Sequence, residues 1–124
     1  MPARILLVED DREARAMLTF LLREEGFLVT AAEDGRAALQ LIDAACPDLV
    51  ITDLQMPNLD GFELIKALRR RPSYSGIPIL VVSACCDEAA PLALAAGANS
   101  TADKPVQIDC VVDIIKHLLC KPTA

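Results

Sequence analysis

Residues 47–53 read Pro-Asp-Leu-Val-Ile-Thr-Asp, an apolar run that follows a proline and ends in a carboxylate. A short run of aliphatic and β-branched residues with no polar face is typical of a buried strand. Pro47 ends the helix expected before it. Asp53 is followed by Leu-Gln-Met-Pro and not by a turn that leads straight into a helix. We therefore predict a strand over 48–53 with Asp53 at its carboxyl end.

Four more apolar runs flank this one in the chain. We expect strands over 4–8, 27–32, 77–83 and 98–102. Between the runs, apolar residues recur at the spacing of amphipathic helices. The expected helices cover about 14–22, 35–45 and 61–71, then the alanine- and leucine-rich segment that ends at Gly97, and finally 108–119.

Several helix ends carry signals in the sequence. Gly26 before Phe27 is typical of a helix that ends with a left-handed glycine. The basic run 69–71 falls at a helix C-terminus, where cations complement the helix dipole, so we expect it to lie in solvent and not to contact nucleic acid. Three aspartates stand just before helices and are expected to cap them. They are Asp11, Asp34 and Asp60.

Strand and helix alternate about five times along the chain. This alternation favours a parallel sheet with helices on both faces, and right-handed crossovers then place the carboxyl end of every strand at one edge. We predict an α/β fold with a doubly wound, flavodoxin-like, five-stranded parallel sheet of strand order 2-1-3-4-5. In such a sheet, ligands bind at the carboxyl edge where the strand order reverses, between the first and third strands.

The composition excludes several classes of function. The 124 residues are 53% hydrophobic and 3% aromatic, so we expect an aliphatic core and expect no stacking platforms for single-stranded nucleic acid. A net charge of −6 has the wrong sign for binding a phosphate backbone. No apolar run is long enough to span a membrane. The odd number of cysteines favours reduced thiols in a cytoplasmic protein. They are Cys46, Cys85, Cys86, Cys110 and Cys120.

Polar residues follow the predicted strands where each one ends. Glu9 and Asp10 follow the first strand, Asp53 ends the third, Ser83 ends the fourth and Lys104 follows the fifth. Converging carboxylates repel one another unless a cation is present. A hard cation with oxygen ligands, such as Mg²⁺, is the natural solution. A carboxylate beside two positive charges and a hydroxyl is suited to accepting a phosphoryl group as an aspartyl phosphate.

The residues at these strand ends resemble the receiver domain of two-component response regulators. The resemblance runs from about Ile5 to Leu119, with all its motifs in order, and implies one receiver domain over 1–121 with 122–124 as a tail or the start of a linker. The motifs are Val8-Glu9-Asp10-Asp11, Thr52-Asp53-Leu54-Gln55-Met56-Pro57, Leu59-Asp60-Gly61, Val82-Ser83-Ala84, Gly97-Ala98 and Asp103-Lys104-Pro105.

The resemblance implies a role for each acidic residue of the site. Asp53 would accept a phosphoryl group from a phosphohistidine on a sensor histidine kinase or a histidine phosphotransfer protein. Asp10 and Asp53 would bind Mg²⁺ directly, together with the backbone carbonyl of Gln55. Glu9 would act mostly through water.

The resemblance also assigns the remaining polar positions. Ser83 would supply the hydroxyl that moves toward the phosphoryl group. Lys104 would contact the phosphoryl oxygens, and the peptide bond that joins it to Pro105 would be cis. Gln55 and Cys85 would tune the attack of water on the aspartyl phosphate. The switch position, usually Tyr or Phe in the family, is Thr101 here, which predicts a muted or differently routed switch.

Partners are implied in the same way. The donor would dock beside the acidic site, and the downstream partner would be a protein that the sequence does not identify, with a phosphorylation-dependent dimer as a further possibility. Ala14 and Met17 are open to a second interpretation, as core residues of the first helix. The candidate docking residues are Ala14, Met17, Pro105 and Val106.

Two alternatives to a signalling switch were weighed. A small phosphatase or phosphotransferase that forms an aspartyl phosphate would need a general acid two residues after the nucleophile, where Gln55 cannot serve. A phosphorylation-independent interaction module would not need the set Asp10, Asp53, Ser83 and Lys104. We therefore expect no enzymatic turnover beyond the phosphorylation and dephosphorylation of the chain itself.

Overall fold

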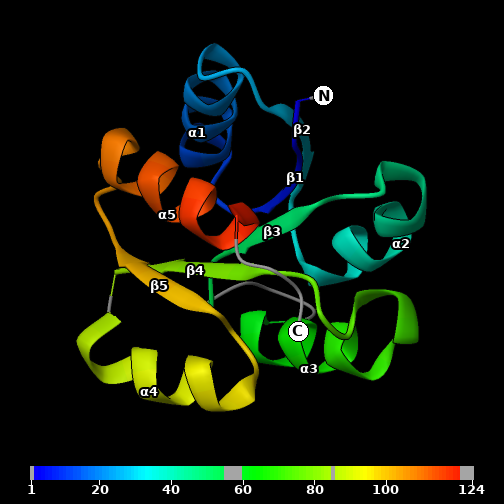
Figure 1. Ribbon diagram of the computed structural model, residues 1–124. Helices are drawn as coiled ribbons and strands as arrows, with labels where there is room; N and C mark the ends of the chain where they lie inside the picture. The colour runs from blue at the N-terminus through cyan, green and yellow to red at the C-terminus, as the bar shows by residue number, and fades with distance from the viewer. Residues whose placement is uncertain (1, 55–59, 85, 121–124) are drawn as a thin grey trace.

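The computed structural model describes residues 2–54, 60–84 and 86–120, without the side chains of 86–88. Strands and helices alternate through these residues (Figure 1). The strands are β1 (Arg4–Val8), β2 (Leu28–Ala32), β3 (Leu49–Thr52), β4 (Ile79–Ser83) and β5 (Ser100–Asp103). The helices are α1 (Arg12–Glu24), α2 (Gly35–Ala45), α3 (Gly61–Arg70), the short 3₁₀ helix η1 (Pro72–Tyr74), α4 (Cys86–Ala96) and α5 (Ile108–Cys120).

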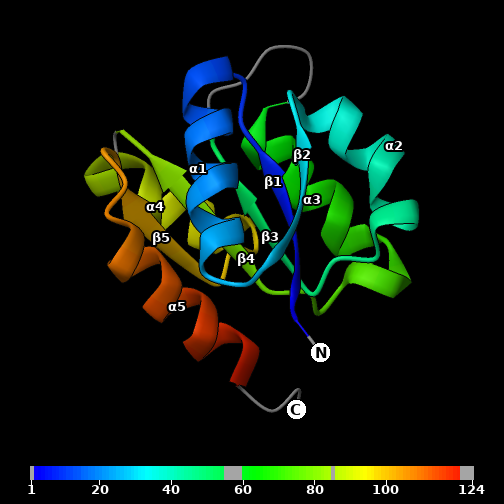
Figure 2. The same cartoon turned by 90° about the horizontal axis from the view of Figure 1, so that it is seen from above.

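The sheet has the predicted topology. All neighbouring strands are parallel and their order is β2-β1-β3-β4-β5. Helices α1 and α5 cover one face of the sheet, whereas α2, α3 and α4 cover the other (Figures 1 and 2). The doubly wound fold predicted from the sequence is therefore confirmed, and it brings the carboxyl ends of β1 and β3 together at the centre of one edge.

The core is aliphatic on both faces of the sheet, as the composition predicts. Leu64, Ile65 and Leu68 of α3 are fully buried under one face. On the other face, Leu22 of α1 and Ile115 of α5 are fully buried. Burial of such side chains contributes roughly 1.5–3 kcal/mol each, so the core holds the strand ends in a fixed register.

The helix caps agree with the sequence analysis. Asp11, Asp34 and Asp60 each accept a hydrogen bond from the backbone N–H three residues later, at 3.0, 2.7 and 2.9 Å. Gly26 has a φ of 96°, the left-handed conformation predicted for the residue that ends α1. These aspartates are therefore helix caps, as predicted.

The fourth and fifth predicted strands begin two residues too early. The N–H of Ile77 bonds to the carbonyl of Tyr74 in η1 at 3.2 Å, and the N–H of Ala98 bonds to the carbonyl of Ala93 at 3.0 Å. Both backbone groups thus complete the preceding helical turn and cannot join the sheet. The local pattern of apolar residues does not show whether a backbone N–H bonds to a helical turn or to a neighbouring strand.

The solvated position predicted for the whole basic run 69–71 is wrong for Arg69. Its guanidinium is half-buried and donates to the carbonyls of Gly97 at 2.7 and 3.0 Å and Ile77 at 2.7 Å. It also donates to the side-chain oxygen of Asn99 at 2.8 Å. Arg69 therefore ties the end of α3 to the segments that precede β4 and β5.

No helix among the described residues is both long enough and apolar enough to cross a membrane.

Candidate phosphoryl-acceptor site

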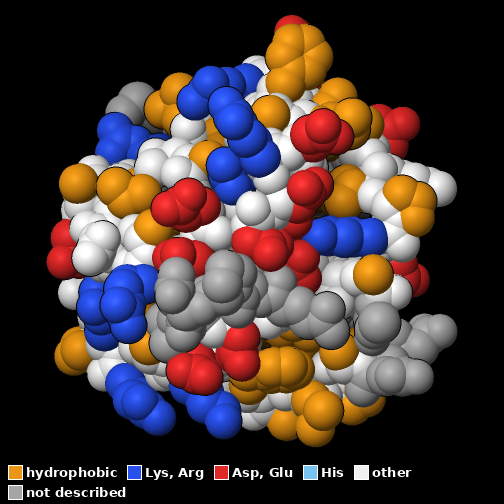
Figure 3. Space-filling model, turned by 180° about the vertical axis from the view of Figure 1, so that it is seen from behind, with side chains coloured by type: hydrophobic (Ala, Val, Ile, Leu, Met, Phe, Trp, Pro, Cys, Tyr) orange, Lys and Arg blue, Asp and Glu red, His pale blue; other side chains and the backbone are white. Residues whose placement is uncertain are grey.

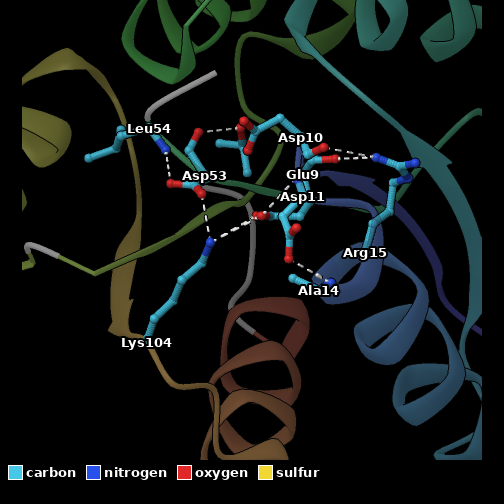
Figure 4. A network of polar contacts seen from close by, with 9 residues as sticks. Glu9, Asp10, Asp11, Ala14, Arg15, Asp53, Leu54 and Lys104 are labelled. Carbon is cyan, nitrogen blue, oxygen red and sulfur yellow. Dashed lines mark hydrogen bonds and ion pairs between the residues drawn. The ribbon is translucent and has the colours of Figure 1, made fainter. Parts of the chain in front are cut away.

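Glu9 and Asp53 follow two neighbouring strands at the centre of the sheet. Val8 of β1 lies opposite Thr52 of β3 in the parallel register, so the residues that come next lie side by side. The N–H of Asp53 bonds to the carbonyl of Val8 at 3.1 Å and extends this pairing by one residue. Both carboxylates point to the same place beyond the strand ends (Figure 4).

Lys104 follows β5, and its side chain reaches these two carboxylates. Its ammonium nitrogen lies 2.6 Å from Oδ2 of Asp53 and 3.1 Å from both carboxylate oxygens of Glu9 (Figure 4). The backbone N–H of Lys104 is held by the carbonyl of Ser83 at 3.1 Å, and the peptide bond to Pro105 is cis, as predicted. Lys104 thus bridges the two acidic residues.

Burial makes this bridge electrostatically favourable. Glu9 is 5% exposed and Asp53 is 8% exposed, and a nearby positive charge stabilises carboxylates that are so far from water. Burial raises the pKa of Glu9, while the hydrogen bond from Lys104 opposes that shift. Burial alone would lower the pKa of Lys104, but its hydrogen bonds to Asp53 and Glu9 outweigh this effect and raise it. The lysine is therefore held in its charged form.

Asp10 completes a group of three acidic residues that could hold a cation. One carboxylate oxygen each from Glu9, Asp10 and Asp53 lie within 4.8 Å of one another. Three carboxylates against one ammonium leave the site negative, which favours a divalent cation over a monovalent one. Oxygen ligands alone are the set that Mg²⁺ prefers, so these residues fit the ion predicted from the sequence. The predicted carbonyl ligand of Gln55 lies outside the described residues.

Figure 3 shows the molecule from the side of this edge. Acidic side chains gather near the middle of the face, with Lys and Arg side chains around them. Acidic side chains are therefore concentrated at this edge, although Lys and Arg side chains lie on the same face.

The backbone after β3 is fixed by two further contacts. Oδ1 of Asp53 accepts a hydrogen bond from the N–H of Leu54 at 2.6 Å, and the carbonyl of Leu54 accepts one from the N–H of Gly61 at 2.9 Å. A Cβ atom on Gly61 would collide with the carbonyl oxygen of Asp53 and lie 2.7 Å from Cα of Leu54. Glycine is thus required at position 61, a role that the sequence alone did not reveal.

Two of the remaining predicted site residues lie on β4 and β5. Ser83 is 4% exposed and ends β4, opposite Asp103 in the register. Thr101 is half-buried on β5 and lies opposite Val81, two residues before the end of the strand. Gln55 and Cys85 fall outside the described residues.

The four candidate docking residues line one cavity beside the site. Ala14, Met17, Pro105 and Val106 surround a space of about 350 Å³ that also reaches Asp53. Met17 is 66% exposed, so the alternative that it belongs to the core is wrong. Ala14 is half-buried. The structure thus brings these residues together, although it does not identify what binds there.

Arg15 is a residue of this site that the sequence analysis missed. Its guanidinium donates to the carbonyl of Glu9 at 2.8 Å (Figure 4). The available signal was its spacing, because Arg15 lies one helical turn after Asp11 and can reach back to the loop before α1.

Comparisons with known proteins agree on one family. The family model of the response regulator receiver domain matches residues 5–116. The response regulator MprA of Mycolicibacterium vanbaalenii is 40% identical over 124 residues, which cover 99% of this chain and 53% of MprA. The chain therefore spans about half the length of this relative. An uncharacterized 14.6 kDa protein of Leptolyngbya boryana is 39% identical over 82% of this chain and 79% of its own length.

Solved structures show the same fold at similar identity. The chemotaxis protein CheY4 of Vibrio cholerae superposes with a TM-score of 0.89 and 31% identity, over 95% of this chain and 99% of that one. A crystal structure of a Chloroflexus aurantiacus protein assigned to the response regulators gives a TM-score of 0.92 and 36% identity, over 98% of this chain and 100% of that one.

Proposed function

The chain belongs to the family of response regulator receiver domains, and from this premise we propose that it accepts a phosphoryl group on Asp53 in a two-component system. The observation that carries the proposal is the 2.6 Å contact between Lys104 and Asp53, which lies within a group of three carboxylates suited to Mg²⁺. This arrangement places positive charge where the oxygens of a transferring phosphoryl group would lie.

The proposed reaction is a single displacement at phosphorus. A carboxylate oxygen of Asp53 attacks the phosphorus atom of a phosphohistidine, the new O–P bond forms as the P–N bond breaks, and the imidazole leaves with the electron pair. The N–H of Leu54 and the ammonium of Lys104 orient the carboxylate before attack. Lys104 then stabilises the negative charge of the phosphoryl oxygens.

Glu9, Asp10 and Asp53 are the described residues that would hold the cation. When bound, Mg²⁺ supplies positive charge beside the phosphoryl oxygens and offsets the repulsion between these oxygens and the carboxylates. Glu9 also accepts hydrogen bonds from the Lys104 ammonium, so it keeps the lysine close to Asp53 while the phosphoryl group is absent.

We propose that the donor is a sensor histidine kinase or a histidine phosphotransfer protein and that the output is altered binding of a partner protein or a second copy of the chain. The cavity lined by Met17 and Pro105 opens beside Asp53, which supports docking of the donor there. We further propose a cytoplasmic location, no direct contact with nucleic acid, and no turnover beyond phosphorylation and dephosphorylation of the chain itself.

Labelling with acetyl phosphate tests the proposal without a cognate donor. We expect intact-mass spectrometry to show one added phosphoryl group in the presence of Mg²⁺ and none with EDTA. Asp53→Asn should remain unlabelled. The matched control is Asp113→Asn, which removes an exposed carboxylate of α5 and should label like the wild type. Equal labelling of Asp53→Asn would show that the acceptor is another residue.

A further inference from the structure

We propose that Arg15 is a positioning residue for divalent-cation binding, because it fixes the loop that presents the carboxylates of Glu9 and Asp10. This inference rests on the proposed function, since it concerns the same site. The guanidinium of Arg15 would act on the site only through its hydrogen bonds to the backbone carbonyls of Glu9 and Asp10.

The contacts of Arg15 converge on the loop between β1 and α1. Its Nη1 atom lies 2.8 Å from the carbonyl oxygen of Glu9 and 3.4 Å from that of Asp10 (Figure 4). The first contact is a firm hydrogen bond, and the second is a longer, weaker branch of it. Arg15 is half-buried, so its position is defined by packing as well as by these bonds.

The residues on either side of Asp10 each make a further contact that does not involve Arg15. The N–H of Glu9 bonds to the carbonyl of Ala32 at 3.0 Å, and Asp11 is fixed as the cap of α1. For Asp10, the contact from Arg15 is the only hydrogen bond to the residues that the structure describes. The direction of the exposed Asp10 carboxylate therefore depends on the backbone that Arg15 holds.

The charge of Arg15 and its geometry have opposite consequences for a bound cation. A guanidinium bound to the backbone of Glu9 and Asp10 repels a divalent cation held by their carboxylates, so loss of its charge alone would strengthen Mg²⁺ binding. Loss of its hydrogen bonds would loosen the Glu9–Asp10 backbone and weaken Mg²⁺ binding. Groups that orient metal ligands typically contribute about 10–100-fold to metal affinity, so the geometric effect should prevail. The sign of the change thus separates the two roles.

Isothermal titration of Mg²⁺ alone into the unphosphorylated, full chain measures this sign. We expect Arg15→Met, which keeps the aliphatic stem, to raise the dissociation constant by about ten-fold. Arg15→Lys restores the charge without the planar fork and should recover only part of the affinity. The matched control is Arg12→Met on the same helix, an exposed arginine whose side chain makes no hydrogen bond to the described residues. Its affinity should stay within about two-fold of the wild type.

A second measurement separates positioning from damage to the fold. Urea unfolding in EDTA should give Arg15→Met and Arg12→Met similar midpoints, both close to the midpoint of the wild type. Unchanged or tighter Mg²⁺ binding by Arg15→Met would overturn the inference. Failure of the proposed function would look different, because wild-type protein would then bind Mg²⁺ but gain no phosphoryl group on Asp53.

Discussion

Tyr74 illustrates how strongly one contact can set the chemistry of a residue in this protein. Its hydroxyl donates to Oδ1 of Asp43 at 2.6 Å, which links η1 to the end of α2. The hydrogen bond to Asp43 raises the pKa of Tyr74 to about 12. This hydrogen bond is the largest cause of the raised pKa, and desolvation of the half-buried side chain adds to it.

The ionisation of Tyr74 can be measured directly. Tyr74 is the only tyrosine and the chain has no tryptophan, so the near-ultraviolet absorbance of tyrosinate reports this one residue. We expect a midpoint at about pH 12 in the wild type and a fall toward the ordinary 10.0 in Asp43→Asn. Since the folded pKa is above the unfolded value, the bond stabilises the fold below about pH 10 and this contribution is lost as the pH rises through 12. Equal midpoints would contradict the assignment.

At the scale of elements, α3 is held by its buried apolar residues against the sheet and also by the hydrogen bonds of one side chain. Arg69 near its C-terminus donates to backbone carbonyls on the segments before β4 and β5. A guanidinium, with five donors in a plane, can satisfy several carbonyls that no strand partner reaches. The sequence could not predict this arrangement, because it depends on distant loops that converge only after the sheet forms.

Removal of this guanidinium should destabilise the fold. Arg69→Met keeps much of the stem but leaves the carbonyls of Gly97 and Ile77 without their donor, which should lower the free energy of unfolding by about 2–4 kcal/mol. Arg70→Met, at the next and exposed position of α3, should change it by less than about 0.5 kcal/mol. Urea unfolding followed by circular dichroism provides the measurement. Similar losses in both variants would show that charge, and not the specific bonds, is what matters.

Most of the element pattern could be predicted from the sequence, and the errors have physical causes. The order of strands and helices follows from apolar periodicity, and the caps at Asp11 and Asp60 follow from their place before helices. The predicted starts of β4 and β5 were wrong because the N–H groups of Ile77 and Ala98 bond to the preceding helical turn and not to a neighbouring strand. The contact of Gly61 with Asp53 was missed because backbone packing leaves no sign in the residue type beyond the glycine itself.

At the scale of the whole molecule, the site and the cavity beside it form one continuous surface. The cavity passes from Glu9 and Asp53 to exposed apolar side chains of α1 and the loop after β5. The fold brings these segments together for two reasons. The strands β1 and β3 are neighbours within the sheet, and α1 and α5 cover the same face of it (Figure 2). The acidic residues were predictable from their positions after strands, but the exposure of Met17 required the packed helix.

A charge placed on this surface should separate the two phosphoryl donors. Met17→Glu should slow transfer from a phosphohistidine protein by about ten-fold, because it puts a charge in an apolar contact. Labelling by acetyl phosphate should be unchanged, since Met17 is exposed and makes no part of the acidic site. Leu92→Glu on α4 is the control, with a similar exposure of 63% and no place in this cavity. Equal loss with both donors would indicate damage to the fold.

The central claim is that Asp53 is the residue that forms the aspartyl phosphate, and site mapping tests it most directly. Wild-type protein labelled by acetyl phosphate with Mg²⁺ is treated with borohydride, which reduces an acyl phosphate to an alcohol, and is then fragmented by mass spectrometry. The account predicts reduction at Asp53 alone. Reduction at Asp10 or Glu9, or at no carboxylate, would contradict it.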